Sequence, residues 1–254
     1  MSLSAVAAVA GQTDADPFAG KREVPDTRLY ELRTYHANGG KLDPLLARFR
    51  DHTAKLFKKH GMTNIAYWVP ADNPDGLLIY LMAYPDRESR DASWKAFHND
   101  PEWKKAASDS EKDGKLIRKV DSVFMKTTDF SEGFGDMFSG GLYEMRTYTA
   151  SPDRLPNLHA RFREHTLGLF AKHGMNNHAY FQLTPGQPGS ENTLLYFLSH
   201  KDKESAVKSW DAFRADPEWT ETQMASEKEA GGSLTIDDGV KSVFLKPTDF
   251  SPVK

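Results

Sequence analysis

The sequence repeats itself. LYELRTY at Leu29–Tyr35 returns as LYEMRTY at Leu142–Tyr148, and the segments that follow each copy correspond as well. In both copies the residues alternate as a half-buried strand requires. A chain of 254 residues with such a repeat is expected to fold as two similar units.

Each repeat has the same expected order of elements. After the first strand, apolar residues at helical period predict a helix that ends at Gly61 or Gly174. A second helical region bends where an Asp N-cap precedes Pro. The remaining strands are expected, in chain order, at Ile65–Val69, Leu77–Tyr84, Ser122–Lys126, Ala179–Leu183, Thr193–His200 and Ser242–Lys246.

The order β-α-β-β-α-β is that of a ferredoxin-like unit, an antiparallel sheet with both helices on one face. Two such sheets can cover each other's bare faces, so the sequence predicts an α+β fold with a closed or nearly closed barrel and helices outside. The predicted domains are a disordered or signal-derived leader, a first repeat, a Gly-rich linker and a second repeat, at residues 1–28, 29–131, 132–141 and 142–251.

Several motifs occur together in both copies. They are the opening YELRTY, a helix ending in Lys-His-Gly, an aromatic strand, and a Trp-x-x-Phe helix followed by Asp-Pro-Glu-Trp. In combination they resemble the NIPSNAP family of the dimeric α+β barrel superfamily. The resemblance implies a tandem arrangement that replaces a dimer. It implies no mechanism, since related proteins include cofactor-free monooxygenases and haem-handling enzymes, whereas animal members resemble organelle-associated interaction proteins.

Composition excludes several kinds of site. A formal charge of -3 with interspersed signs gives no argument for a nucleic-acid partner, and the absence of cysteine excludes thiol chemistry and thiolate metal sites. His52 and His60 are eight residues apart, about 12 Å along a helix, too far to share one metal. The same spacing separates His165 from His173. No metal or other cofactor is predicted.

The N-terminal stretch Ser4–Ala10 is rich in alanine. It is too short to span a membrane, but it resembles the end of a signal segment with small residues at a cleavage site. If it is a trimmed signal peptide, the protein is exported to a periplasm or secreted. If it is a disordered tail, the protein is cytoplasmic.

The charged face of the two repeated strands is the main candidate site. With Leu32 and Met145 facing the helices, this face would lie between the two sheets and receive a small organic anion or an enolisable molecule. The alternative is a structural network in which each Arg neutralises its own Glu. The predicted ligand-binding residues are Glu31, Arg33, Tyr35, Glu144, Arg146, Tyr148, His178 and His200.

The proton-transfer candidates are His52, His165, Tyr35 and Tyr148. His52 and His165 lie at the edge of the apolar helical stripe and are expected either to reach the sheet or to be half-buried structural residues. His60 and His173 are expected to cap helix C-termini.

Two functional classes follow from these residues. The first is a binding protein or cofactor-independent enzyme for a small organic anion, and the second is a non-catalytic scaffold. Ile65 and Tyr84 correspond to His178 and His200, and the second repeat has a longer loop at Thr184–Asn192. These differences predict an asymmetric site with a histidine from the second repeat. Unpaired edge strands are also compatible with a homo-oligomer.

Overall fold

The computed structural model describes residues 26–131 and 141–253. The Ala-rich N-terminal stretch and nearly all of the predicted linker lie outside the described residues.

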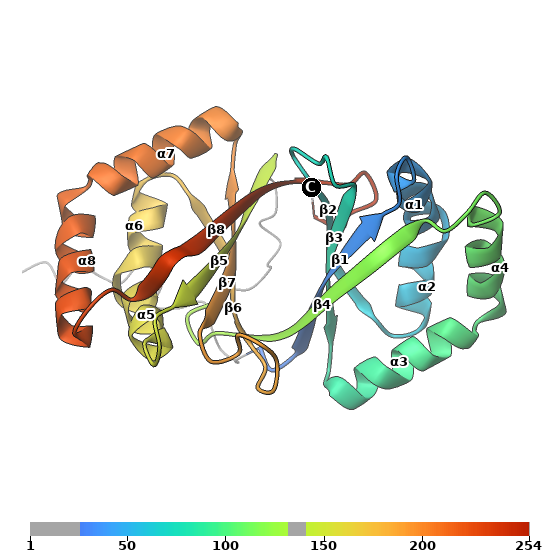
Figure 1. Cartoon of the computed structure of the whole chain (residues 1–254), viewed down its shortest axis with the longest axis horizontal. Helices are drawn as coiled ribbons and strands as arrows, with labels where there is room; N and C mark the ends of the chain where they lie inside the picture. The colour runs from blue at the N-terminus through green and yellow to red at the C-terminus, as the bar shows by residue number, and fades with distance from the viewer. Residues whose placement is uncertain (1–25, 132–140, 254) are drawn as a thin grey trace, which may run out of the picture.

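Eight strands form one closed antiparallel barrel in the order β1-β3-β2-β8-β5-β7-β6-β4 (Figure 1). Each repeat contributes four of them, as the sequence predicts, but the last strand of each is longer than expected. The strands are β1 (Leu29–Ala37), β2 (Thr63–Pro70), β3 (Leu77–Tyr84), β4 (Ile117–Thr127), β5 (Leu142–Ala150), β6 (Asn176–Leu183), β7 (Thr193–His200) and β8 (Thr235–Pro247).

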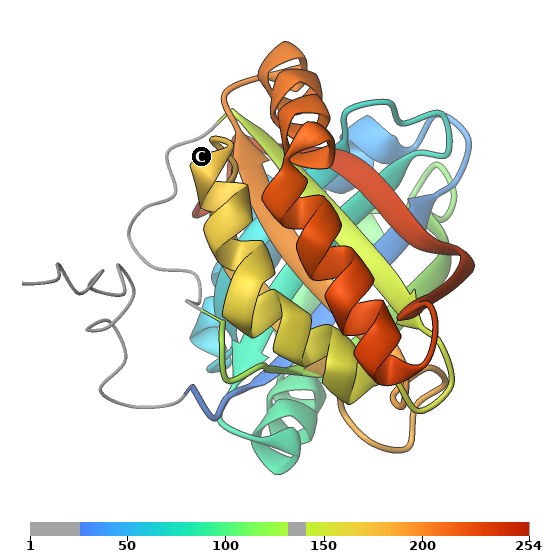
Figure 2. The same cartoon turned by 90° about the vertical axis from the view of Figure 1, so that its left-hand side faces the viewer.

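The helices lie outside the barrel in two groups, one for each repeat (Figures 1 and 2). The first group is α1 (Leu42–Arg48), the π-helical turn η1 (Phe49–Thr53), α2 (Ala54–Lys59), α3 (Arg87–Asn99) and α4 (Pro101–Ser110). The second group is α5 (Leu155–Arg161), the π-helical turn η2 (Phe162–Thr166), α6 (Leu167–Lys172), α7 (Lys203–Ala215) and α8 (Pro217–Ala230).

Local sequence explains the helix boundaries. The Asp100 side chain accepts a hydrogen bond from the Glu102 amide, and Pro101 opens α4, so α3 and α4 meet at a bend as predicted. Gly61 follows α2 with a φ of +76°, a conformation that favours glycine. The π-helical turns were not predicted, because the apolar pattern was matched to a regular α-helical period.

Each repeat also contacts the other through the end of its last strand and the residues that follow it. The end of β4 pairs with β6, and the end of β8 pairs with β2. Ser131 then accepts a hydrogen bond from the Tyr180 amide at 3.0 Å, and Ser251 accepts one from the Tyr67 amide at 3.0 Å. Phe130 is buried in the helix-side core of the second repeat. The two repeats therefore close the barrel reciprocally.

The barrel interior is filled by one apolar cluster drawn from both repeats, including Tyr30, Leu32 and Trp68. Two further apolar clusters, one in each repeat, lie between the four strands of that repeat and its helices. The predicted orientation of the first strand is therefore wrong, since Leu32 points into the barrel and Tyr35 packs on the helix side. Alternation fixes only which residues share a face. The helix side takes the charged face because helix residues there supply partners for it.

Candidate functional site

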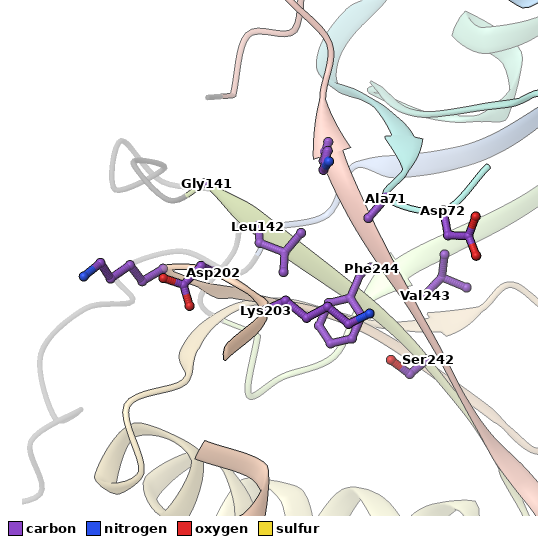
Figure 3. Close-up of a pocket in the computed structure, with 11 residues that line it drawn as sticks. Ala71, Asp72, Gly141, Leu142, Asp202, Lys203, Ser242, Val243 and Phe244 are labelled. Atoms are coloured by element: carbon purple, nitrogen blue, oxygen red, sulfur yellow. The ribbon is translucent and has the colours of Figure 1, made fainter. Parts of the chain in front are cut away.

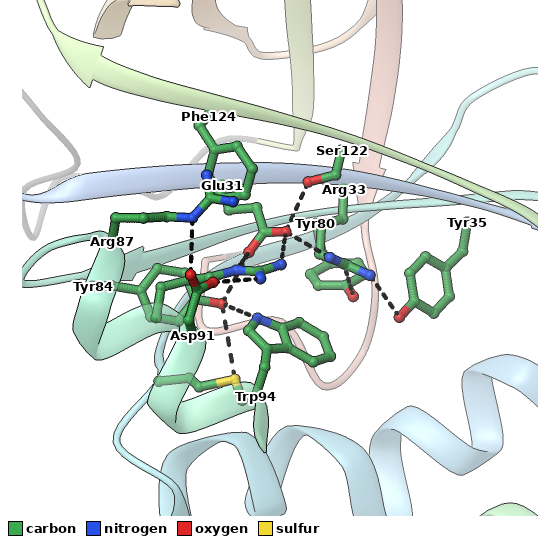
Figure 4. A network of polar contacts seen from close by, with 12 residues as sticks. Glu31, Arg33, Tyr35, Tyr80, Tyr84, Arg87, Asp91, Trp94, Ser122 and Phe124 are labelled. Carbon is green, nitrogen blue, oxygen red and sulfur yellow. Dashed lines mark hydrogen bonds and ion pairs between the residues drawn. The ribbon is translucent and has the colours of Figure 1, made fainter. Parts of the chain in front are cut away.

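The Glu31 carboxylate is buried under α3 and fully paired (Figure 4). Arg33 Nη1 lies 2.5 Å from Oε1, Arg90 donates to both oxygens at 2.7 and 2.9 Å, and Ser122 Oγ donates at 2.7 Å. Burial alone would raise the pKa of Glu31, but the Arg90 hydrogen bonds and the Arg33 charge outweigh it and lower that pKa. This carboxylate is therefore held ionised.

Arg33 has partners on several sides in this network. Its guanidinium lies 4.4 Å from the Trp94 ring centroid, its Nε donates to Tyr80 Oη at 2.9 Å, and its Nη2 lies 3.5 Å from Tyr35 Oη. The predicted group Glu31, Arg33 and Tyr35 is thus brought together. It forms closed pairs on the helix side, which is the arrangement that the structural alternative describes.

The second repeat builds a similar network on Glu144 with different partners. Arg146 Nη1 and Ser242 Oγ each lie 2.6 Å from Oε1, and His200 Nε2 and Trp210 Nε1 each lie 2.8 Å from Oε2. Burial opposes ionisation, but the His200 hydrogen bond and the Arg146 charge lower the pKa of Glu144 to about 2. His200 corresponds to Tyr84, as the repeat alignment predicts.

Arg146 and Tyr148 line a cleft of about 410 Å³, together with Trp210, Arg214 and Gln223. The Arg146 guanidinium lies 4.1 Å from the Trp210 ring centroid. A role of Arg146 or Tyr148 in ligand binding stays a prediction.

His178 and His200 do not meet at a common rim. His178 is 5% exposed, lies against the Tyr143 ring and has its Nε2 2.8 Å from Ser199 Oγ. Burial, followed by the charge of His200, lowers its pKa to about 4. His200 is 2% exposed, and its Nδ1 has no hydrogen-bond partner among the described residues.

The four helix histidines singled out in the sequence, His52, His60, His165 and His173, lie away from the barrel interior. His52 and His165 are exposed within the π-helical turns. The expectation that they reach the sheet and the alternative that they are half-buried structural residues are therefore both wrong. The extra residue of the π turn accounts for this, since it rotates the side chains that follow. His60 and His173 end their helices as predicted. Their rings also bond the N-cap carboxylates of Asp100 and Asp216, each at 2.7 Å.

A cavity at the junction of the repeats was not predicted. This junction hollow has a volume of about 550 Å³ and lies where β5 begins and α7 begins (Figure 3). Phe244 and Ser242 of β8 and Leu142 of β5 line it. Its charged residues are Asp72, Lys201, Asp202, Lys203 and Lys246.

The corresponding place in the first repeat is filled by the chain itself. Gln187 accepts a hydrogen bond from the Phe124 amide at 2.8 Å and donates one to the Phe124 carbonyl at 2.8 Å. The guanidiniums of Arg87 and Arg90 lie 4.1 and 5.2 Å from the Phe124 ring centroid. The longer loop Thr184–Asn192 therefore covers a first-repeat surface instead of opening a second-repeat pocket.

The junction hollow lacks these fillers. Lys203 and Ala206 take the places of Arg87 and Arg90. The loop after β2 is three residues shorter than the loop after β6, and Asn73 in it bonds the Leu77 backbone. Across residues 26–131 and 141–253, no side chain accepts a hydrogen bond from the Phe244 amide, as Gln187 does from the Phe124 amide. The two signals in the sequence were the shorter loop and the Arg-to-Ala difference at Ala206.

Neither a metal centre nor a membrane helix is present in the described part of the chain. No three His, Asp or Glu side chains there are placed to hold a metal ion. No described helix has both the length and the apolar character needed to cross a bilayer.

A family model described as NIPSNAP matches residues 30–132 and 143–252. The chain belongs to the NIPSNAP family. A NIPSNAP domain protein from Burkholderia xenovorans is 22% identical, with 40% of this chain and 96% of that chain covered and a TM-score of 0.36. A comparison with curated proteins gives no match.

Two solved structures match this NIPSNAP protein over both repeats. A candidate monooxygenase from Fusobacterium nucleatum is 10% identical, covers 89% of this chain and 94% of its own, and has a TM-score of 0.55. An anthrone oxidase-like protein is 11% identical, covers 90% and 94%, and also has a TM-score of 0.55. At these identities the likeness establishes the shared α+β barrel.

Proposed function

We propose that this NIPSNAP protein binds a small organic carboxylate with a planar apolar group in the junction hollow. The observation that carries the proposal is the contrast between the two repeats. Over Phe124 of the first repeat, the carboxamide of Gln187 from the second repeat and two guanidiniums close the hollow, whereas about 550 Å³ stays open over Phe244. That volume is within the range of small-molecule sites, roughly 300–1,000 Å³.

The lining favours an anion with a flat apolar part. Lys201, Lys203 and Lys246 outnumber the two carboxylates, and one of these, Asp202, already caps α7 through the Ser205 amide at 2.8 Å. The Phe244 ring offers an apolar face on which an aromatic group can pack. A ligand carboxylate could accept from the Phe244 amide as the Gln187 oxygen does from Phe124.

The proposal moves the ligand from the space between the sheets to the helix side. The barrel interior is occupied by apolar side chains, and Arg33 and Arg146 are each paired with a carboxylate. Those pairs act as supports for the sheet in this proposal, since a buried charge needs a partner. Ser242 joins the Glu144 network to the wall of the junction hollow.

Isothermal titration with benzoate, phenylacetate, cyclohexanecarboxylate and benzamide tests the proposal. We expect the aromatic carboxylates to bind at least tenfold more tightly than benzamide, which lacks the charge. Ala206→Arg introduces the first-repeat residue and should weaken binding at least tenfold. Val207→Arg adds the same group at the neighbouring exposed position and should leave binding unchanged. Failure of every carboxylate to bind, or equal affinities in the two variants, would contradict the proposal.

A second variant covers the case in which Ala206→Arg does not fold. Lys203→Glu reverses a charge on the exposed wall of the junction hollow and should abolish carboxylate binding. Lys228→Glu reverses an exposed charge on α8, outside the hollow, and should have no effect. Equal binding by these two variants would also contradict the proposal.

A cofactor-independent enzyme is the second candidate, and one observation favours it. His200 Nε2 lies against the Glu144 carboxylate, and its Nδ1 has no partner among the described residues. A carboxylate that orients an imidazole in this way is the arrangement of a general base. His200 is not itself among the residues that line the junction hollow, but it directly precedes Lys201, which is. In this second candidate it takes a proton from an enolisable aromatic 2-oxo acid bound there and returns it to the enolate.

Hydrogen–deuterium exchange of phenylpyruvate in D₂O, followed by NMR, separates the two candidates. Exchange that His200→Tyr abolishes, without weakening of carboxylate binding, supports the enzyme. Binding without accelerated exchange supports the binding protein. The non-catalytic scaffold remains if neither binding nor exchange occurs.

A further inference from the structure

Arg161 is the buried cation that is least well paired in the described part of the chain. Its side chain is 5% exposed, yet its Nε and Nη1 make no hydrogen bond there. The Glu227 carboxylate is 3.8 Å from Nη1, beyond hydrogen-bond distance. Burial lowers the pKa of Arg161. A guanidinium so placed lacks the hydrogen bonds that normally offset its desolvation.

The corresponding arginine of the first repeat is better satisfied. Arg48 Nη1 donates to Glu111 at 3.0 Å and to Ser110 at 3.3 Å. Each arginine lies 5.2 Å from the ring centroid of an equivalent tryptophan, Trp103 or Trp219, so the local packing is alike. The difference is therefore in the polar partners.

Arg161 lines a cavity of about 390 Å³ between the η2 turn and α8, which we name the helical groove. Three carboxylates line the same groove, those of Glu164, Glu221 and Glu229, and His165 lies beside them. A simple anion that enters would meet this acidic rim. A simple cation would meet Arg161. The two charges together call for a ligand that carries both.

The first repeat has a smaller groove, of about 260 Å³, in which two lysines lie among three carboxylates. Lys105 and Lys55 are there at the positions of Glu221 and Gly168, and Lys105 pairs with Asp109. The second repeat has therefore lost two lysines from the rim and a close carboxylate partner from the arginine. Both changes affect one groove.

We propose that the helical groove binds a small zwitterion, an amino acid whose carboxylate pairs with Arg161 and whose ammonium group pairs with the rim glutamates. The carboxylate supplies the two acceptors that a guanidinium takes in a bidentate pair. The ammonium offsets the repulsion among Glu164, Glu221 and Glu229. The site is independent of the junction hollow and of the function proposed for it.

Titration calorimetry of the whole protein with glycine, β-alanine, 4-aminobutyrate and 6-aminohexanoate tests this site. Acetate and methylamine serve as the two halves of the ligand. We expect one chain length to bind best and each half to bind at least tenfold more weakly. Acetate or methylamine binding as tightly as every zwitterion would overturn the proposal, and so would no binding by any of them.

Variants locate the zwitterion. Glu221→Lys introduces the first-repeat residue at the rim and should weaken binding at least tenfold, whereas Glu204→Lys on α7 should leave it unchanged. Arg161→Gln should abolish binding, and Arg48→Gln, its counterpart in the first repeat, should not. If Arg161→Gln does not fold, the Glu221 and Glu204 pair still decides. Equal binding by that pair would overturn the proposal. Ala206→Arg, which closes the junction hollow, should not alter zwitterion binding, because the two sites are separate.

Discussion

His200 Nε2 lies 2.8 Å from Glu144 Oε2, and each side chain is 1% exposed. With Arg146 on the other carboxylate oxygen, the pair places a charged cluster between β5 and α7. The folded pKa of Glu144, about 2, is below its ordinary value of 4.5. Ionised Glu144 therefore adds stability above pH 4.5, and this contribution is lost as the pH falls toward 2.

Glu144→Gln should lower the free energy of unfolding by about 3–5 kcal/mol at pH 7, because it leaves Arg146 buried without a carboxylate. Urea denaturation measures the change. Glu31→Gln is the matched variant and should cost at least as much, since Glu31 pairs with both Arg33 and Arg90. A loss below about 1 kcal/mol for either variant would mean that the networks contribute little to stability.

His178 should make the fold sensitive to mild acid. Its pKa falls from 6.5 to about 4 on folding, so protonation favours the unfolded chain between those values. The stability that depends on neutral His178 is fully present above pH 6.5 and is lost as the pH falls to about 4. A shift of this size corresponds to about 3 kcal/mol. Among the described residues, the groups that face the ring include Ser199, Tyr143 and His200.

His178→Ile supplies the control, because the first repeat carries Ile65 at this position. Urea denaturation at pH 7 and pH 4.5 should give a smaller difference for this variant than for the wild type. The carboxylates titrate alike in both proteins and cancel in the comparison. Equal pH dependence would show that His178 is not protonated on unfolding in this range.

Phe130 should be important for joining the two repeats. It is 3% exposed and lies in the core of the second repeat, with its ring 5.6 Å from that of Tyr180. Phe130→Ala should destabilise the protein by about 3–5 kcal/mol in thermal or urea unfolding. Phe250→Ala removes the counterpart, which is only partly buried, and should cost less. A larger loss for Phe250→Ala would contradict this ranking.

The fold could be predicted because the repeat and the alternation of apolar residues are properties of the sequence itself. All eight strands lie where expected, and the bend before Pro101 and Pro217 follows from local capping. The direction in which Leu32 points could not be obtained in the same way. Both faces of β1 are buried, and only the partners across the space, such as Arg90 and Trp94, distinguish them.

The candidate sites were harder to predict because they depend on which side chains fill a space. The pairing of Glu31 with Arg33 follows from their spacing on one strand. The junction hollow is recognised only by contrast with the first repeat, where Gln187 reaches Phe124 from 63 positions away in the sequence. The helical groove depends on a difference of less than 1 Å in the distance from each arginine to its glutamate, 3.8 Å for Arg161 and 3.0 Å for Arg48. Such differences arise from tertiary packing.

If the junction hollow binds because its fillers are missing, removing the fillers from the first repeat should create a second site. The triple variant Arg87→Lys, Arg90→Ala and Gln187→Ala frees the Phe124 ring and amide. Glu31 keeps Arg33 and Ser122, so the buried carboxylate stays paired. Titration with phenylacetate should then give a stoichiometry of two in place of one.

Adding Ala206→Arg to the triple variant is the control for this experiment. It should close the hollow of the second repeat and return the stoichiometry to one, with the remaining ligand bound over Phe124. Thermal unfolding of each variant without ligand would show that the fold is retained, because Glu31 remains buried and paired. A triple variant that folds and still binds one equivalent would show that an open hollow over Phe124 does not suffice for binding. Binding of phenylacetate in the junction hollow would then depend on the lysines around Phe244, which are Lys201, Lys203 and Lys246.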